Sequence, residues 1–147
     1  MKIDDIYSLF SKSSGISTDT RTIKKNNIFF CLKGEKFDGN LFIDQAFHLG
    51  ASFVVYDDDQ LNYKSEKAIR VKNALETLQS LAKYHRSKFN IPVISLTGSN
   101  GKTTSKELIN SVLSQKLNVT FTSNNFNNHI GVPLTILEIN RKTDLAI

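Results

Sequence analysis

The 147-residue sequence is poor in three residue types, with one cysteine, two prolines and no tryptophan. A single cysteine excludes the small, disulfide-stapled class of secreted proteins and is typical of a reducing compartment. Cys31 lies in the apolar run 28–32, so we expect a small buried side chain and not a nucleophile.

Long apolar runs are also missing. No stretch approaches the about 20 residues that a membrane-spanning helix needs. Asp4 and Asp5 stand where a secretory signal peptide would be basic, so we expect no signal peptide. These features predict a cytoplasmic protein without a membrane partner.

The net charge is +5 and the isoelectric point is near 9.3, which by itself would allow a nucleic-acid-binding protein. However, the basic residues are scattered singly or in pairs, without a basic run or a basic-aromatic stripe. We therefore predict no nucleic-acid partner, because a mildly basic surface facing an anionic nucleotide explains the charge equally well.

One glycine-bearing stretch carries chemistry: Gly98-Ser99-Asn100-Gly101-Lys102-Thr103-Thr104. It follows an apolar run at 91–96 and precedes a helical pattern at 103–115, the order in which such loops bind phosphate at a helix N-terminus. Lys102 could reach the terminal phosphates, and the Thr103 hydroxyl could hold a magnesium ion. The motif predicts nucleotide binding without specifying the reaction. The alternative is a plain glycine turn, since Leu96 stands where the longer form of the motif has glycine.

The rest of the chain alternates between helical and strand patterns, which predicts an α/β fold. We expect residues 33–40 to form a polar loop, Asn40 to cap the next helix, and 57–59 to be a solvated acidic turn and not a metal site. Asn73 and Glu76 have the spacing of a capping box. We expect helices over 2–12, 40–50, 73–88, 103–115 and 133–139, and strands over 28–32, 52–56, 68–71, 91–96, 118–122 and 144–147.

Two domains are predicted, a small α/β domain over 1–89 and the beginning of a P-loop-type parallel-sheet domain over 90–147. Residues 144–147 have the pattern of a further buried strand, and a sheet of so few strands would leave its faces uncovered. We therefore expect the chain to be part of a longer protein.

Three stretches, in matching order, resemble the Mur ligases of peptidoglycan precursor synthesis. Residues 97–104 are similar to the shortened ATP loop of that family. Residues 17–21 together with 27–34 and 37–39 look like its N-terminal UDP-sugar domain. Residues 125–135 resemble the branch that adds D-alanyl-D-alanine to UDP-MurNAc-tripeptide, the MurF type.

The resemblance implies a monomeric, cytoplasmic bacterial ligase that uses ATP and Mg²⁺ and joins D-alanyl-D-alanine to UDP-MurNAc-tripeptide through an acyl phosphate. It implies catalytic roles for Lys102 and Thr103, with magnesium held by Thr103. The implied ATP-phosphate ligands are Gly98, Ser99, Asn100, Gly101, Lys102, Thr103 and Thr104, and the implied substrate ligands are Asp19, Thr20, Arg21, Asn127 and Asn128. Without the resemblance, 19–21 would be a capped turn and 127–128 an ordinary Asn turn.

Two positions depart from the family pattern. Asn40 stands where the family often has His, and Asn124 replaces a common Gly. Further magnesium ligands and the domain that holds adenine and D-alanyl-D-alanine are not in these residues, so we expect the chain alone to be inactive. The alternatives are another Mur-type or folylpolyglutamate-type ligase, or a nucleotide-binding module without chemistry.

Overall fold

The computed structural model describes residues 1–35, 37–122 and 128–147. The chain forms two compact units, 1–81 and 82–147, and the division falls within helix α3 (Ala74–Arg86). Each unit contains parallel strands and helices, so the predicted α/β class is confirmed. The two units are described separately below.

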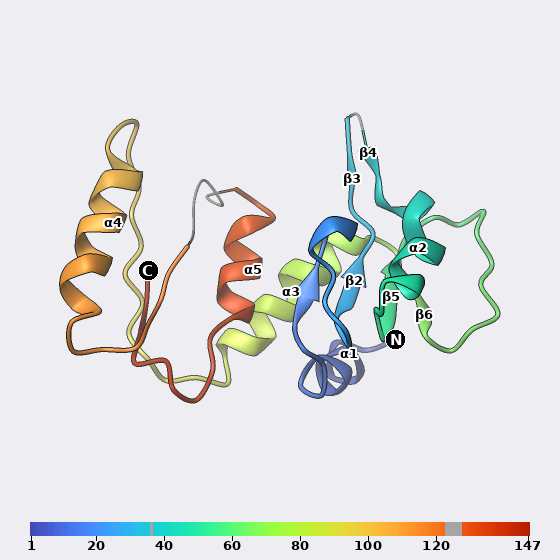
Figure 1. Ribbon diagram of the computed structural model, residues 1–147, viewed down its shortest axis with the longest axis horizontal. Coiled ribbons are helices and arrows are strands. Elements are labelled where there is room, and N and C mark those ends of the chain that lie inside the picture. Colours follow the sequence, from blue (N-terminus) through green and yellow to red (C-terminus); the bar gives the residue numbers. More distant parts are fainter. Residues whose placement is uncertain (36, 123–127) are drawn as a thin grey trace. The chain divides into compact units, whose positions relative to one another are not determined.

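The first unit contains a four-stranded parallel sheet in the order β1-β2-β5-β6 (Figure 1). Its central strands are buried on both faces, and Phe29, Val54 and Val55 have no exposed surface. Such continuous apolar runs are the sequence signature of a covered parallel sheet. The strands are β1 (Ile16–Ser17), β2 (Ile28–Phe30), β5 (Phe53–Tyr56) and β6 (Ala68–Arg70).

The helices of this unit follow the expected apolar spacing. α1 (Ile3–Phe10) buries Ile6 and Phe10, and α2 (Ile43–His48) buries Ile43 and Ala46. α3 begins at a side-chain cap, because Asn73 Oδ1 accepts the Glu76 N–H at 3.0 Å. This is the acceptor side of the capping box that the sequence predicts.

The region predicted as a polar loop is instead a hairpin of β3 (Lys33–Gly34) and β4 (Phe37–Asp38), which extends beyond β2 in Figure 1. A 3-10 helix, η2 (Gly39–Phe42), follows it. The predicted N-cap was wrong: Asp38 accepts the Asn40 N–H at 2.9 Å, while Asn40 is buried. The loop prediction failed because the strands are too short to show an alternating pattern. The Gly39 N–H extends their pairing by donating to Leu32 O at 2.8 Å.

The predicted acidic turn is only partly a solvated one. Asp57 is half-buried, and its Oδ2 accepts the Ala74 N–H at 2.9 Å, at the start of α3. Asp58 is half-buried as well, and Asp59, the last of the three, is exposed as expected. The first carboxylate of the run thus serves the N-terminus of a helix, where negative charge is favourable.

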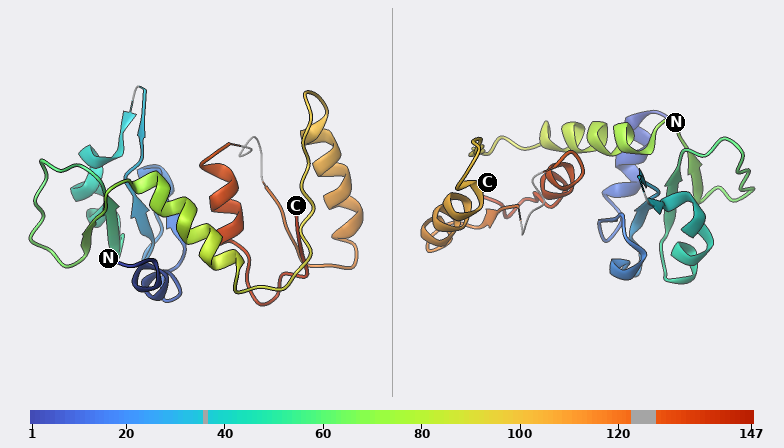
Figure 2. Two further views of the ribbon diagram at one scale, coloured as in Figure 1. Left: turned by 180° about the vertical axis from the view of Figure 1, so that it is seen from behind. Right: turned by 90° about the horizontal axis from the view of Figure 1, so that it is seen from above.

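The second unit contains α4 (Lys102–Leu113), β7 (Val119–Thr120), α5 (Gly131–Leu137) and β8 (Leu145–Ala146). β7 and β8 pair in parallel, and Val93 forms a parallel bridge with Ala146. Within residues 91–96, all described, this bridge is the only strand pairing, so the predicted strand is shorter than expected. Residues 92–98 lead up to the glycine loop and α4 returns beside them (Figure 2).

The predicted apolar face at the end of α3 includes a buried histidine. His85 is 6% exposed, its Nε2 lies 2.7 Å from Ile139 O, and its ring lies 4.8 Å from that of Phe89. Since a carbonyl oxygen only accepts, Nε2 carries the proton. His85 therefore belongs to the buried face of α3, and its polar edge ties α3 to the segment that follows α5.

Candidate functional site

The glycine loop reaches α4 through a left-handed residue. Gly101 is the N-cap of α4 with φ +77°, a conformation that side chains disfavour. Glycine has no side chain with which to cap this end of the 12-residue helix, and among the described residues no side chain bonds to its first N–H groups. The first-turn N–H groups are therefore available to an anion, which the positive end of the helix dipole also attracts.

The loop side chains that were predicted to bind phosphate lie at this same end. Lys102 is half-buried, and its Nζ donates a hydrogen bond back to Gly98 O. Ser99, Asn100 and Thr104 are exposed. The geometry brings together backbone donors and one ammonium group, an arrangement that can bind a phosphate group.

A cavity of about 550 Å³ opens beside the loop. Thr97, Gly98, Lys102 and Thr103 line its polar end. The remaining lining is largely apolar and comes mostly from residues 93–96, from α5 and from the β8 region, with Arg86, Lys106 and Thr122 as further polar members. It includes Val93, Ile94, Leu96, Val132, Ile136, Ile139, Ala146 and Ile147. A few polar groups at one end of an apolar cavity are typical of small-molecule sites.

The chemistry of the loop fits a magnesium ion bound together with a nucleotide. The exposed Thr103 side chain stands on the first turn of α4, and its oxygen is the kind of ligand that magnesium prefers. Over residues 1–35, 37–122 and 128–147, no group of three or more His, Cys, Asp or Glu side chains could hold a metal ion.

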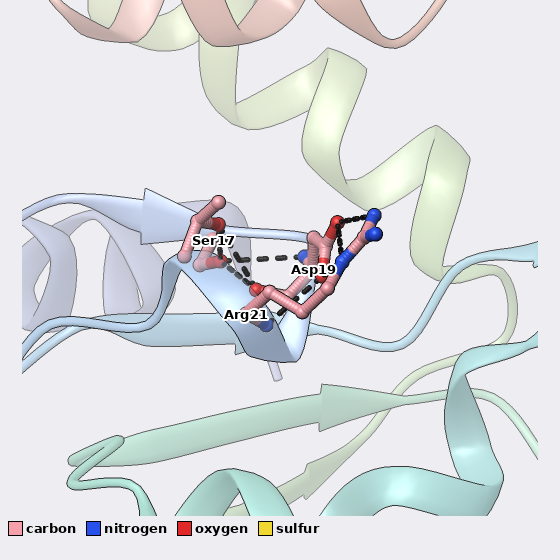
Figure 3. A network of polar contacts seen from close by, with 4 residues as sticks. Ser17, Asp19 and Arg21 are labelled. Atoms are coloured by element: carbon pink, nitrogen blue, oxygen red, sulfur yellow. Dashed lines mark hydrogen bonds and ion pairs between the residues drawn. The ribbon is translucent and has the colours of Figure 1, made fainter.

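The predicted substrate residues of the first unit form a tight polar turn (Figure 3). Asp19 caps the 3-10 helix η1 (Thr20–Thr22), because its Oδ1 accepts the Arg21 N–H at 2.9 Å. Arg21 Nε donates to both Asp19 oxygens at 3.0 Å, and Nη2 donates to Oδ2 at 2.5 Å. Ser17 Oγ donates to Asp19 O at 2.8 Å, which also holds the turn in place.

This pair sets the charge state of the turn. The hydrogen bonds from Arg21 hold the pKa of the Asp19 carboxyl below its ordinary value, and the same contact raises the pKa of Arg21. The Arg21 side chain is 86% exposed, so one edge of the guanidinium faces the carboxylate while the group remains open to solvent. A guanidinium held in this way can still offer donors to an anion.

The predicted substrate residues of the second unit are only partly described. Asn127 lies outside the described residues. Asn128 is exposed, and its Oδ1 accepts the N–H groups of Ile130 at 3.0 Å and Gly131 at 2.8 Å, which caps the start of α5. The side-chain amide oxygen of Asn128 therefore has a structural role.

One residue of the cavity was not predicted. Lys106 is buried and lines the cavity together with Lys102. The only sequence signal is its spacing, since a residue four positions after Lys102 lies on the same face of a helix.

No described helix has the length and apolar character needed to cross a membrane.

Comparison with protein families gives two matches in chain order. The model "Mur ligase family, catalytic domain" matches residues 12–86, about half of the chain. The model "Mur ligase middle domain" matches residues 96–147. The first match covers the Asp19–Arg21 turn, and the second covers the glycine loop and α4.

Individual relatives match the chain over most of its length. The UDP-N-acetylmuramoyl-tripeptide–D-alanyl-D-alanine ligase of Bacillus subtilis (strain 168) is 44% identical over 134 residues, which are 90% of this chain and 29% of the relative. The ligase of the same name from Synechocystis sp. (strain ATCC 27184 / PCC 6803 / Kazusa) is 46% identical over 135 residues, 91% of this chain and 30% of the relative.

A solved structure is also similar. The MurF ligase of Thermotoga maritima in complex with ADP superposes with a TM-score of 0.80 at 29% identity, over 99% of this chain and 32% of that one. The chain thus spans about 30% of the length of the curated relatives it matches. With family matches over 12–86 and 96–147 and relatives over most of its length, the chain belongs to the Mur ligase family.

Proposed function

We propose that this chain supplies the UDP-substrate unit and the phosphate-binding loop of a cytoplasmic ATP-dependent ligase that joins D-alanyl-D-alanine to UDP-MurNAc-tripeptide. The observation that carries the proposal is the uncapped start of α4, which Gly101 introduces in a left-handed conformation with Lys102 beside it. The choice of reaction is supported by the names of relatives that match 90% and 91% of the chain.

In the proposed reaction a carboxylate oxygen of the tripeptide attacks the γ-phosphorus of ATP, and ADP leaves. The amine of D-alanyl-D-alanine then attacks the acyl phosphate, phosphate leaves, and the new amide forms with loss of a proton. The N–H groups of residues 98–104 bind phosphate oxygens, and the Lys102 ammonium offsets their charge. Thr103 would hold magnesium, which when bound neutralises charge on the transferred phosphoryl group.

The polar turn of the first unit has a separate proposed role. Arg21, held by Asp19, binds the diphosphate of the UDP substrate, and Thr20 contributes a hydroxyl next to it. Asn127 and Asn128 are also proposed to contact UDP-MurNAc-tripeptide. ATP and the UDP substrate are thus assigned different residues, so the binding of each ligand can be tested separately.

Calorimetric titration of the chain with UDP-MurNAc-tripeptide and with MgATP tests the two sites. Arg21→Ala should weaken the first affinity by roughly tenfold or more, as loss of a charge-assisted hydrogen bond does, and leave the second unchanged. Lys102→Ala should do the reverse. Absence of UDP-MurNAc-tripeptide binding by the unaltered chain would overturn the assignment of the first unit.

Ligation is tested by exchange with the Bacillus subtilis relative. This chain replaces the matching part of that ligase, and phosphate release is followed with ATP, UDP-MurNAc-tripeptide and D-alanyl-D-alanine. Release is expected only when all three are present, and Lys102→Ala in the hybrid is the control. The chain alone is expected to release none, because it spans 29% of that relative. A hybrid that binds both ligands but never releases phosphate would favour a nucleotide-binding module without chemistry.

A further inference from the structure

Helix α4 places a charged side chain where an apolar one is expected. Within α4, all of which the structure describes, Lys106 is the only buried residue, at 8% exposure. Lysine is among the residues that are almost never fully buried unless they are paired, and local rules of this kind are broken mainly at functional sites.

The Lys106 ammonium group is held by polar and aromatic contacts within its own unit. Its Nζ donates to Thr122 O and lies 3.3 Å from Glu107 Oε1. The Phe121 ring centroid is 5.7 Å from Nζ, within the range of a cation–π contact. The Glu107 side chain is half exposed, so water screens this ion pair. Taking an ammonium group out of water has a substantial cost, which an apolar residue at this position would avoid.

The position of Lys106 near the phosphate loop indicates a function for its buried charge. Lys106 follows Lys102 by one helical turn, and both line the 550 Å³ cavity. Thr103 lines the same cavity. The cavity therefore has two lysines on one face of α4 next to the uncapped helix end.

We propose that Lys106 is a second anion-binding residue of this cavity, facing a phosphoryl or carboxylate group bound beside Lys102. This proposal rests on the proposed function, in which a carboxylate and a triphosphate must approach each other. Two like-charged groups repel strongly in a partly dry cavity. Lys102 can neutralise only one of the two anions. A second buried cation, Lys106, reduces the repulsion between the carboxylate and the triphosphate.

The test uses Lys106→Met, which keeps the length of the side chain without its charge, and Lys106→Arg, which keeps the charge. Lys116→Met is the matched control, because Lys116 is an exposed lysine of the same unit. Titrations measure the dissociation constants of MgADP, of its analogue with a non-hydrolysable γ-phosphate, and of UDP-MurNAc-tripeptide with nucleotide present. Thermal midpoints are recorded for every variant. If Lys106→Met does not fold, Lys106→Gln replaces it, since a Gln amide can still donate to Thr122 O.

The expected result is a loss of roughly tenfold in Lys106→Met for one anion, as removal of a charged hydrogen-bonding partner produces. A loss for the γ-phosphate analogue and not for MgADP identifies the phosphoryl group as the anion. A loss for UDP-MurNAc-tripeptide alone identifies the carboxylate. Lys106→Arg should retain most of the affinity, and Lys116→Met all of it.

Affinities in Lys106→Met that equal those of Lys116→Met, whether or not the thermal midpoint drops, would show that Lys106 only ties α4 to Thr122 and would overturn the proposal. The proposed function fails in a different way. In that case the unaltered chain binds none of the three ligands, or Lys102→Ala leaves its nucleotide affinities unchanged.

Discussion

Asn40 and Asp57 are joined by two hydrogen bonds that run in opposite directions. Asn40 Nδ2 donates to Asp57 Oδ1 at 3.2 Å, and the Asp57 N–H donates to Asn40 Oδ1 at 3.2 Å. Asn40 Nδ2 also donates to Asp38 Oδ1 at 2.8 Å. One buried amide thus connects the end of the β3–β4 hairpin with the end of β5, and through Asp57 with the first N–H of α3.

Asn40→Ala should destabilise the first unit by about 2–3 kcal/mol, because it leaves a buried N–H and a carboxylate oxygen without their partner. Urea unfolding of the variant beside wild type measures the change. Asn62→Ala is the control, since Asn62 is exposed and should cost under about 0.5 kcal/mol. Equal midpoints for the two variants would mean that the Asn40 network contributes nothing to stability.

Gly39 lies against the backbone of Cys31 and Leu32, which connect β2 to β3. A Cβ at this position would meet Cys31 Cα, Leu32 N and Leu32 O, each at 2.8 Å. Gly39→Ala therefore forces backbone to move and should cost about 1–3 kcal/mol, as other overpacked sites do. Gly34→Ala is the matched control, because a Cβ there meets nothing within 4 Å. The comparison is a pair of urea melts, and a Gly39 variant as stable as the Gly34 variant would refute the clash.

His85 should make stability depend on pH. Burial lowers its pKa below the ordinary 6.5, although the hydrogen bond to Ile139 opposes this shift. The unfolded chain therefore gains a proton at a higher pH than the folded chain does. The contribution of His85 to folding stability is complete above pH 6.5. It decreases as the pH falls from 6.5 toward the pKa of His85 in the folded chain.

The pH effect is measured by urea unfolding between about pH 7.5 and 5.5, in wild type and in His85→Gln. Gln can donate to Ile139 O but does not titrate, so the two stability curves should diverge as the pH falls. The remaining titratable groups are common to both proteins and cancel in the difference. Parallel curves would show that the His85 proton is not coupled to folding.

Cys31 should be inert in the folded protein. Its side chain has no exposed surface, and burial raises the pKa of the thiol to about 12, with the Asp57 and Asp38 carboxylates adding to the shift. Since the thiolate is the reactive form, a thiol reagent at mildly alkaline pH should label the native chain only through unfolding. The labelling rate should rise with urea in step with the unfolded fraction. Rapid labelling without urea would show that the strand end opens locally.

Elements with strong periodic signals were predictable, and elements held by single contacts were not. The apolar spacing of α1 and the continuous apolar run of β2 give clear patterns, and both elements lie where expected. The β3–β4 hairpin has two-residue strands that show no pattern, and the position of Asn40 depends on Asp57, which is 17 residues away in the sequence. In the candidate site, the glycine loop is a local motif, and the helix that follows it lies where expected. The burial of Lys106 depends on Thr122, which lies on another segment, and no local pattern reveals it.

Asp19 holds Arg21 in place. A substitution of Asp19 should therefore alter the binding of the UDP substrate indirectly, through the position of Arg21. Asp19→Ala frees the exposed guanidinium, and ordering it again costs about 0.5–1.5 kcal/mol per side chain. We therefore expect UDP-MurNAc-tripeptide to bind roughly threefold to tenfold more weakly at about 0.15 M salt, where the gain from removing a negative charge is largely screened. Asp19→Asn should fall between wild type and Asp19→Ala, because its amide oxygen can still accept the Arg21 N–H. Calorimetric titration gives the constants, with MgATP affinity as the internal control. Tighter binding in Asp19→Ala would mean that the carboxylate opposes the anion more than it positions the arginine.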